Sequence, residues 1–139
     1  MRRALALAKG RLGRTGANPA VGCVLAIGGG FLAEAATALG GRPHAEEQAL
    51  AAAGKRARGA AAYVTLEPCA ERSSGATSCA ELLIAAGVAR VVVAAHDPSP
   101  KASGRGVERL RKAGVEVVTG LLAEEAEPLY AAYRRSWLS

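Results

Sequence analysis

Hydrophobic residues along the chain occur in two alternating patterns, continuous apolar runs and longer stretches with helical spacing. The apolar runs predict five strands, at 21–27, 31–37, 61–66, 88–95 and 115–119. The helical stretches predict five helices, at 3–12, 44–53, 79–86, 106–113 and 122–133, the last interrupted by Pro128. Regular alternation of this kind favours an α/β domain built in layers.

Glycines indicate how these elements are connected. Three glycines at 28–30 separate the first two predicted strands, which indicates a hairpin. Gly54 and Gly87 follow the second and third predicted helices and are typical helix stop signals. Because single helices separate the later strands, we expect neighbouring parallel strands there. The chain has 139 residues and no internal repeat, so we expect one domain over 1–139.

Composition narrows the class of partner. The chain is 50% hydrophobic and 22% charged, which is typical of a globular protein. Its formal net charge of +6 suits an anionic partner, but only 4% of residues are aromatic, too few for a platform that stacks unpaired bases. We therefore expect a small phosphorylated substrate and no nucleic acid. No apolar run approaches the roughly 20 residues that span a bilayer, so we expect no membrane partner.

The cysteines and the start of the chain indicate the cellular compartment. Cys23, Cys69 and Cys79 are an odd number of cysteines in a chain without a secretory signal, which favours reduced thiols. The basic and apolar start looks like a signal peptide, but Lys9 ends its apolar stretch too early. We predict a cytoplasmic protein.

His44 and Glu46 stand two positions apart at the start of a predicted helix. Two helical residues at this spacing project about 200° apart, so they do not readily bind one metal ion together. The arrangement suits one metal ligand, His44, and one carboxylate, Glu46, that reaches the water at the metal. On its own, a His-x-Glu triplet is more often a polar pair at a helix start.

Two cysteines complete a candidate zinc site. Pro68-Cys69 directly follows a predicted strand and Cys79 begins the next predicted helix, so the two thiols can converge. One histidine and two cysteines leave the fourth tetrahedral position open, as in catalytic zinc centres. A closed site that also uses Cys23 or His96 is possible by count. We expect Cys23 to be a small buried hydrophobe and His96 a surface or loop residue.

Such a centre supports hydrolytic deamination. Zinc lowers the pKa of a bound water to about 7, which supplies a nucleophile near neutral pH. Glu46 would take the proton of this water, pass it to a ring nitrogen and later protonate the departing ammonia. His-x-Glu followed by Pro-Cys-x-x-Cys is the signature of zinc deaminases that act on bases. Here the second cysteine stands ten residues after the first.

Other short sequence motifs narrow the choice of protein family. They are Asn18-Pro19-Ala20-Val21-Gly22-Cys23-Val24, Pro43-His44-Ala45-Glu46, Ala62-Tyr63-Val64-Thr65-Leu66-Glu67-Pro68-Cys69, Leu83-Ile84-Ala85-Ala86-Gly87-Val88, Asp97-Pro98-Ser99-Pro100 and Gly104-Arg105-Gly106. In this order, and with the long cysteine gap, they resemble the deaminase domain of the bifunctional riboflavin-biosynthesis deaminase/reductase. That domain belongs to the cytidine and deoxycytidylate deaminase-like superfamily.

The resemblance implies a cytidine-deaminase-like, three-layer α/β/α fold with a mixed, largely parallel sheet of about five strands. It implies a substrate, 2,5-diamino-6-ribosylamino-4(3H)-pyrimidinone 5′-phosphate, whose 2-amino group is hydrolysed with loss of ammonia. It also implies Zn²⁺ as the cofactor. The positions that match the zinc ligands are His44, Cys69 and Cys79, and Glu46 matches the proton donor and acceptor.

Further positions match the substrate pocket of the family. Asn18 and Asp97 match residues near the pyrimidine and ribose, and Ala45 is a third substrate-binding position. Asn18 and Asp97 each precede a proline, so a purely structural role in a turn is the alternative for both. The loop at 70–78 departs from the family pattern and is one residue longer, so the phosphate-binding cation is not defined by the match. Arg72 is our candidate, with a solvated loop arginine as the alternative.

The resemblance also concerns partners and chain organisation. We expect no reductase domain within 1–139, so the sequence is either a free-standing deaminase that passes its product to a separate reductase or a piece of a longer chain. Deaminases of this fold commonly associate, so we expect a homodimer.

Two other functions fit the same residues. A zinc deaminase of another base, such as guanine, cytosine or a tRNA adenosine, would use the same metal chemistry, although such enzymes mostly keep the short cysteine gap. A zinc-stabilised paralogue without activity would explain the altered loop, although the intact Glu46 argues against it.

Overall fold

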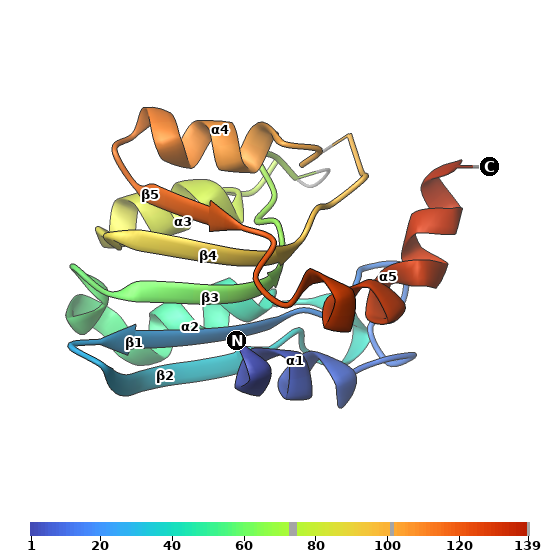
Figure 1. Ribbon diagram of the computed structural model, residues 1–139, viewed down its shortest axis with the longest axis horizontal. Helices are drawn as coiled ribbons and strands as arrows, with labels where there is room; N and C mark the ends of the chain where they lie inside the picture. Colours follow the sequence, from blue (N-terminus) through green and yellow to red (C-terminus); the bar gives the residue numbers. More distant parts are fainter. Residues whose placement is uncertain (73–74, 101, 139) are drawn as a thin grey trace.

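A five-stranded sheet forms the centre of the protein (Figure 1). The structure is a computed structural model that describes residues 1–72, 75–100 and 102–138. The strands are β1 (Gly22–Ile27), β2 (Gly30–Ala36), β3 (Ala61–Leu66), β4 (Arg90–Ala95) and β5 (Glu116–Thr119). The helices are α1 (Arg2–Lys9), α2 (Ala45–Ala53), α3 (Cys79–Ala86), α4 (Arg105–Lys112) and α5 (Ala123–Leu138), with short 3-10 turns η1 (Leu39–Gly41) and η2 (Gly54–Ala57).

The order of the strands across the sheet is β2-β1-β3-β4-β5, and the predicted hairpin is the antiparallel pair β1 and β2. The strand β3 is antiparallel to β1, whereas β3–β4 and β4–β5 are parallel pairs. The expected mixed sheet of five strands is therefore confirmed, but parallel pairing is limited to its second half. The crossover through α2 places β3 beyond β1 and parallel to β2, so β3 must oppose β1.

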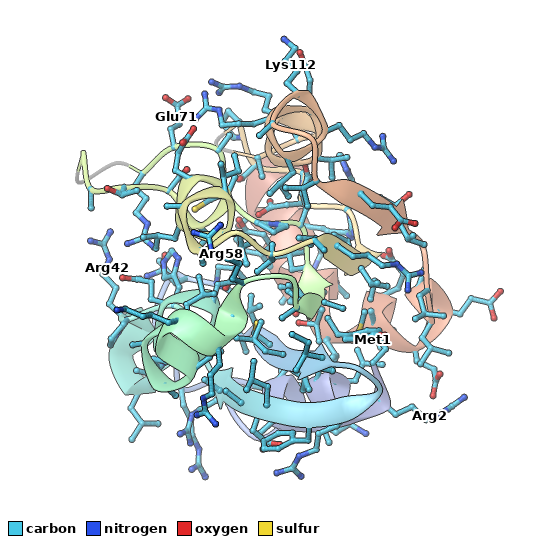
Figure 2. The ribbon with its side chains drawn as sticks, turned by 90° about the vertical axis from the view of Figure 1, so that its left-hand side faces the viewer. Met1, Arg2, Arg42, Arg58, Glu71 and Lys112 are labelled. Carbon is cyan, nitrogen blue, oxygen red and sulfur yellow. The ribbon has the colours of Figure 1, made fainter. Side chains whose placement is uncertain are left out.

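Helices cover both faces of the sheet, as the three-layer prediction requires. Helices α2, α3 and α4 form one layer, in which α3 contacts both neighbours, and α1 contacts α5 in the other. Figure 2, turned by 90°, shows the two helical layers on opposite sides of the strands. Gly22 allows the close approach of α1 to β1, because a Cβ there would lie 1.9 Å from the carbonyl oxygen of Ala4.

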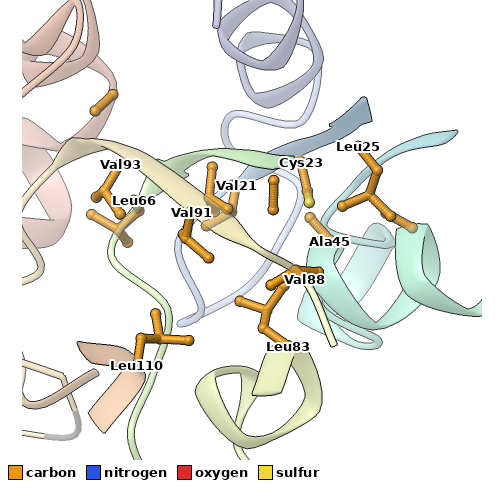
Figure 3. Packing of buried hydrophobic residues seen from close by; sticks show 14 of the residues in the cluster. Val21, Cys23, Leu25, Ala45, Leu66, Leu83, Val88, Val91, Val93 and Leu110 are labelled. Carbon is orange, nitrogen blue, oxygen red and sulfur yellow. The ribbon is translucent and has the colours of Figure 1, made fainter. Parts of the chain in front are cut away.

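The hydrophobic core includes residues of α2, α3 and α4 on one face of the sheet and Leu5, Ala126 and Tyr130 of α1 and α5 on the other; Figure 3 shows part of it. Strand β4 is buried along nearly its whole length, as expected for a central parallel strand covered on both faces. Its side chains Val91 and Val93 pack in one cluster with Leu66, Leu83 and Leu110. The apolar runs predicted as strands therefore supply one part of the core, and the helices packed on them supply the other.

The ends of the chain differ from the sequence prediction. Helix α1 ends at Lys9, and α5 continues past Pro128 to Leu138, so the expected interruption of this helix is wrong. Proline removes one backbone donor, which bends a helix without always ending it, and α5 changes direction along its length in Figure 1. Tyr130 anchors it, because its buried hydroxyl donates to the carbonyl oxygen of Ala20 at 2.8 Å.

No helix in the described part of the chain has both the length and the apolar composition needed to cross a membrane.

Candidate metal centre and substrate pocket

Three elements bring the predicted metal ligands together. His44 immediately precedes α2, Cys69 follows the end of β3, and Cys79 is the first residue of α3. One ligand atom from each residue lies within 4.8 Å of the other two. Because both helices start beside the end of β3, residues that are 35 positions apart in the chain become neighbours.

The spacing of these atoms fits a zinc ion. The distance from His44 Nδ1 to Cys79 Sγ is 3.4 Å. Zinc bonds of about 2.0–2.3 Å in a tetrahedron place ligand atoms about 3.5 Å apart, so little movement is needed to accommodate the ion. The backbone N–H of Cys79 donates to Cys69 Sγ at 3.3 Å. Hydrogen bonding with Cys79 lowers the pKa of Cys69 well below its usual range, which favours the thiolate that binds metal.

The remaining histidine and cysteine lie elsewhere. Cys23 is buried in β1 opposite Val64, and burial raises the pKa of its thiol. His96 Nδ1 lies 3.1 Å from Glu67 Oε1. Among the described residues, the only group of three or more potential ligands is formed by His44 with the two other cysteines. The described residues therefore bring together three potential ligands, one fewer than a closed tetrahedral site requires.

Glu46 points into the same pocket as the ligands. The residue is only 4% exposed, and it lines the pocket together with His44 and Cys69. Burial, reinforced by the negative charge at Cys69, raises the pKa of Glu46 to about 7. A carboxyl group that titrates near neutral pH can both accept and donate a proton, as an acid–base catalyst must.

The pocket next to the ligands contains most of the predicted substrate contacts. Asn18, Arg72 and Asp97 line it from three separate loops. Ala45 is fully buried at the start of α2 and is not among the lining residues. Arg42, which sequence reasoning missed, lines the pocket and is exposed; its position next to Pro43-His44 was the available signal. Figure 2 shows Arg42 and Glu71, another lining residue, on the same side of the molecule.

Hydrogen bonds hold two of these residues in place. The side-chain amide of Asn18 donates to the carbonyl oxygen of Gly41 at 3.2 Å. Asp97 Oδ1 accepts hydrogen bonds from the backbone N–H of Ser99 at 2.8 Å and from the Tyr133 hydroxyl at 3.2 Å. Burial raises the pKa of Asp97 despite these donors. Both side chains are thus oriented by backbone groups before any ligand binds.

Arg72 makes its closest contacts with the metal centre. Its Nη2 lies 2.8 Å from Glu47 Oε1 and donates to Cys79 Sγ at 3.3 Å. Residues 73 and 74, in the loop that departs from the family pattern, lie outside the described residues. The phosphate-binding role of Arg72 stays a prediction.

Sequence reasoning also missed the contacts of Glu67, although this residue belongs to the Thr-Leu-Glu-Pro-Cys motif. Its carboxylate accepts hydrogen bonds from the backbone N–H groups of Gly104 and Val107 at the start of α4. Gly106 fits beside Pro68 because it has no Cβ, which would lie 1.9 Å from the Pro68 carbonyl oxygen. This segment between β3 and Cys69 is therefore fastened to α4.

Comparison with known proteins places these features in a family. Residues 1–95 match the model of the cytidine and deoxycytidylate deaminase zinc-binding region. The chain belongs to this family. The matched region of this chain contains Glu46 and the three predicted ligands, His44, Cys69 and Cys79.

The chain is similar to proteins named for riboflavin biosynthesis. It is 49% identical over 129 residues to the riboflavin biosynthesis protein RibD of Escherichia coli (strain K12), covering 93% of this chain and 35% of RibD. It is 42% identical over 127 residues to the diaminohydroxyphosphoribosylamino-pyrimidine deaminase of Buchnera aphidicola subsp. Acyrthosiphon pisum, covering 91% of this chain and 86% of that protein. The chain thus spans about a third of the RibD relatives and most of the Buchnera protein.

A solved structure agrees with this relationship. Acinetobacter baumannii RibD, form 2, superposes with a TM-score of 0.91 at 43% sequence identity, over 98% of this chain and 38% of that RibD chain. The mixed five-stranded sheet with helices on both faces is therefore the cytidine-deaminase-like fold of the RibD structures.

Proposed function

We propose that this chain is a zinc-dependent deaminase of riboflavin biosynthesis. Its substrate would be 2,5-diamino-6-ribosylamino-4(3H)-pyrimidinone 5′-phosphate, and its products 5-amino-6-(ribosylamino)uracil 5′-phosphate and ammonia. The observation that carries the proposal is the grouping of His44, Cys69 and Cys79 beside a pocket that the first two of them line together with Glu46. Identity of 42% to a pyrimidine deaminase, over 86% of that protein, supports the substrate.

The chemistry replaces a C–NH₂ group by C=O and consumes one water. His44, Cys69 and Cys79 would hold the zinc ion, which supplies Lewis acidity and makes water nucleophilic near neutral pH. Glu46 accepts the proton of the attacking water and passes it to the adjacent ring nitrogen. It then delivers the second proton of the water to the leaving amino group, which departs as ammonia.

The rest of the pocket would orient the substrate. Asn18 and Asp97 are the expected contacts to the pyrimidine and ribose, and both line the pocket. Ala45 is a further expected contact, although its buried side chain does not line the pocket. Among the residues that the structure describes, Arg42 and Arg72 are the arginines that line the pocket, and Arg42 is the exposed one. Arg42 is therefore a second candidate for the phosphate contact, beside the predicted Arg72.

Three features of the protein's context remain predictions from the sequence. They are a homodimer, a cytoplasmic location and a separate reductase that consumes the product.

The decisive experiment measures ammonia release by the zinc-loaded protein from a panel of substrates. The panel contains the ribosylaminopyrimidine phosphate, guanine, cytosine and cytidine. We expect release from the ribosylaminopyrimidine phosphate and little from the other three compounds. Activity on guanine alone would overturn the assignment to riboflavin biosynthesis.

A further inference from the structure

Arg72 stands between two of the metal ligands. We propose that Arg72 is a positioning residue of the metal centre, which links His44 to Cys79 through Glu47 and thereby sets the affinity for zinc. The inference rests on the zinc site of the proposed function, but not on the identity of the substrate.

On one side, Arg72 reaches the histidine ligand through a carboxylate. Glu47 Oε1 accepts a hydrogen bond from the backbone N–H of His44 at 2.9 Å. The same oxygen lies 2.8 Å from Arg72 Nη2. This hydrogen bond closes the first turn of α2 and holds the backbone that carries the imidazole. Arg72 in turn fixes the rotamer of Glu47, whose side chain is only partly buried.

On the other side, Arg72 contacts a cysteine ligand directly. Its Nη2 donates to Cys79 Sγ at 3.3 Å, and its side chain is only 8% exposed. This hydrogen bond holds the Cys79 sulfur in place, because charge-assisted hydrogen bonds are strong where water is excluded. A single nitrogen atom therefore bridges the two halves of the site, which come from different helices.

The charges around the site support this role. The sulfur atoms of Cys69 and Cys79 and the carboxyl groups of Glu46 and Glu47 gather around the predicted metal site. Arg72 is the positive side chain in contact with both Glu47 and Cys79. Loss of Arg72 would remove the cation that both Glu47 and Cys79 contact. Groups that hold metal ligands in place typically change metal affinity by about 10- to 100-fold when they are removed.

The test compares zinc affinities, measured by competition with a chromogenic chelator in the absence of substrate. Arg72→Met should bind zinc about 10- to 100-fold more weakly than the parent. Arg72→Lys should fall in between, because it keeps the charge but lacks the planar fork. Glu47→Gln keeps an acceptor for His44 but loses the charge, so it should also weaken binding. If Arg72 and Glu47 act through one link, the double variant Arg72→Met/Glu47→Gln should lose less zinc-binding free energy than the two single variants lose in sum.

A matched control is Arg3→Met. Arg3 pairs with Glu34 on the far side of the sheet, so its removal should leave zinc affinity unchanged. Zinc affinities of Arg72→Met and Glu47→Gln within twofold of the parent would overturn the proposal. So would an unchanged affinity with a raised KM for the phosphorylated substrate, which would assign Arg72 to the phosphate.

Folding is followed by circular dichroism. If Arg72→Met does not fold, Arg72→Lys and Glu47→Gln are compared with the parent instead. Unchanged zinc affinity in both variants would overturn the proposal. Because zinc affinity is read without substrate, the result stands even if the substrate panel identifies a different base.

Discussion

The carboxylate of Glu67 accepts a hydrogen bond from the backbone N–H of Gly104 at 3.0 Å, across 37 positions of the chain. Its other oxygen accepts from the N–H of Val107 at 3.2 Å. The first N–H groups of a helix have no partner within the helix, and a negative charge there also favours the helix dipole. Glu67 therefore caps α4 from outside and ties it to the segment that carries Cys69.

Replacement of this carboxylate should destabilise the fold. In Glu67→Gln, the new NH₂ group would face a backbone donor, so the free energy of unfolding should fall by about 1–2 kcal/mol. Urea unfolding at equal zinc saturation measures the change. Glu116→Gln, at an exposed position on β5, is the matched control and should be nearly neutral. Equal stabilities of the two variants would contradict the capping role.

Glu46→Gln should separate metal binding from proton transfer. Gln has the same shape but cannot accept the proton of the attacking water, so kcat should fall by about 100-fold or more. The zinc content, measured by elemental analysis, should stay that of the parent, because Glu46 is not one of the three grouped ligands. Glu34→Gln, on β2, is the control and should keep full turnover. Turnover retained in Glu46→Gln would remove the proposed shuttle.

The cysteines should differ sharply in their effect on the metal. Cys79→Ala removes a predicted ligand, so bound zinc should fall well below about one ion per chain and ammonia release should be lost. Cys23→Ala should keep both properties, since Cys23 is buried in β1 outside the ligand group. Its small cavity should cost about 1 kcal/mol of stability. Loss of zinc from Cys23→Ala, with the fold intact, would show that the site is closed by a fourth protein ligand.

Asp97 should produce a pH-dependent difference in stability. Burial raises its pKa in the folded state, so between the unfolded and folded pKa values the folded protein binds more protons. The stability contributed by Asp97 is present below about pH 3.9 and is lost as the pH rises through the folded pKa. Asp97→Asn does not titrate, so its stability relative to the parent should increase as the pH rises.

Urea unfolding of both proteins from about pH 4 to about pH 7 tests this dependence. Glu34 provides a contrast, because its hydrogen bond with Arg3 lowers the pKa of its carboxyl group. The stability it contributes is present at neutral pH and is lost in acid, so Glu34→Gln should show the opposite trend. A difference between Asp97→Asn and the parent that does not change with pH would contradict the prediction.

Much of the fold can be predicted from the sequence because burial is periodic. The apolar run at 61–66 coincides with β3, and the stretch at 79–86 coincides with α3. Strong local signals, such as Gly87 after α3, set the boundaries of these elements. The order of the strands could not be predicted in this way, because the insertion of β1 between β2 and β3 depends on which faces pack together.

The chemistry of the site also has one part that the sequence predicts and one part that only the tertiary structure decides. Residue types and spacing in the sequence determined the candidate ligands and the proton shuttle, because a metal centre needs these donors at the ends of adjacent elements. Only the tertiary structure decided the partners of Arg72 and Glu67, and the burial of Ala45. Local sequence patterns encode which residues are buried and where helices begin. The direction of a long polar side chain depends instead on charges and backbone groups that distant segments bring to it.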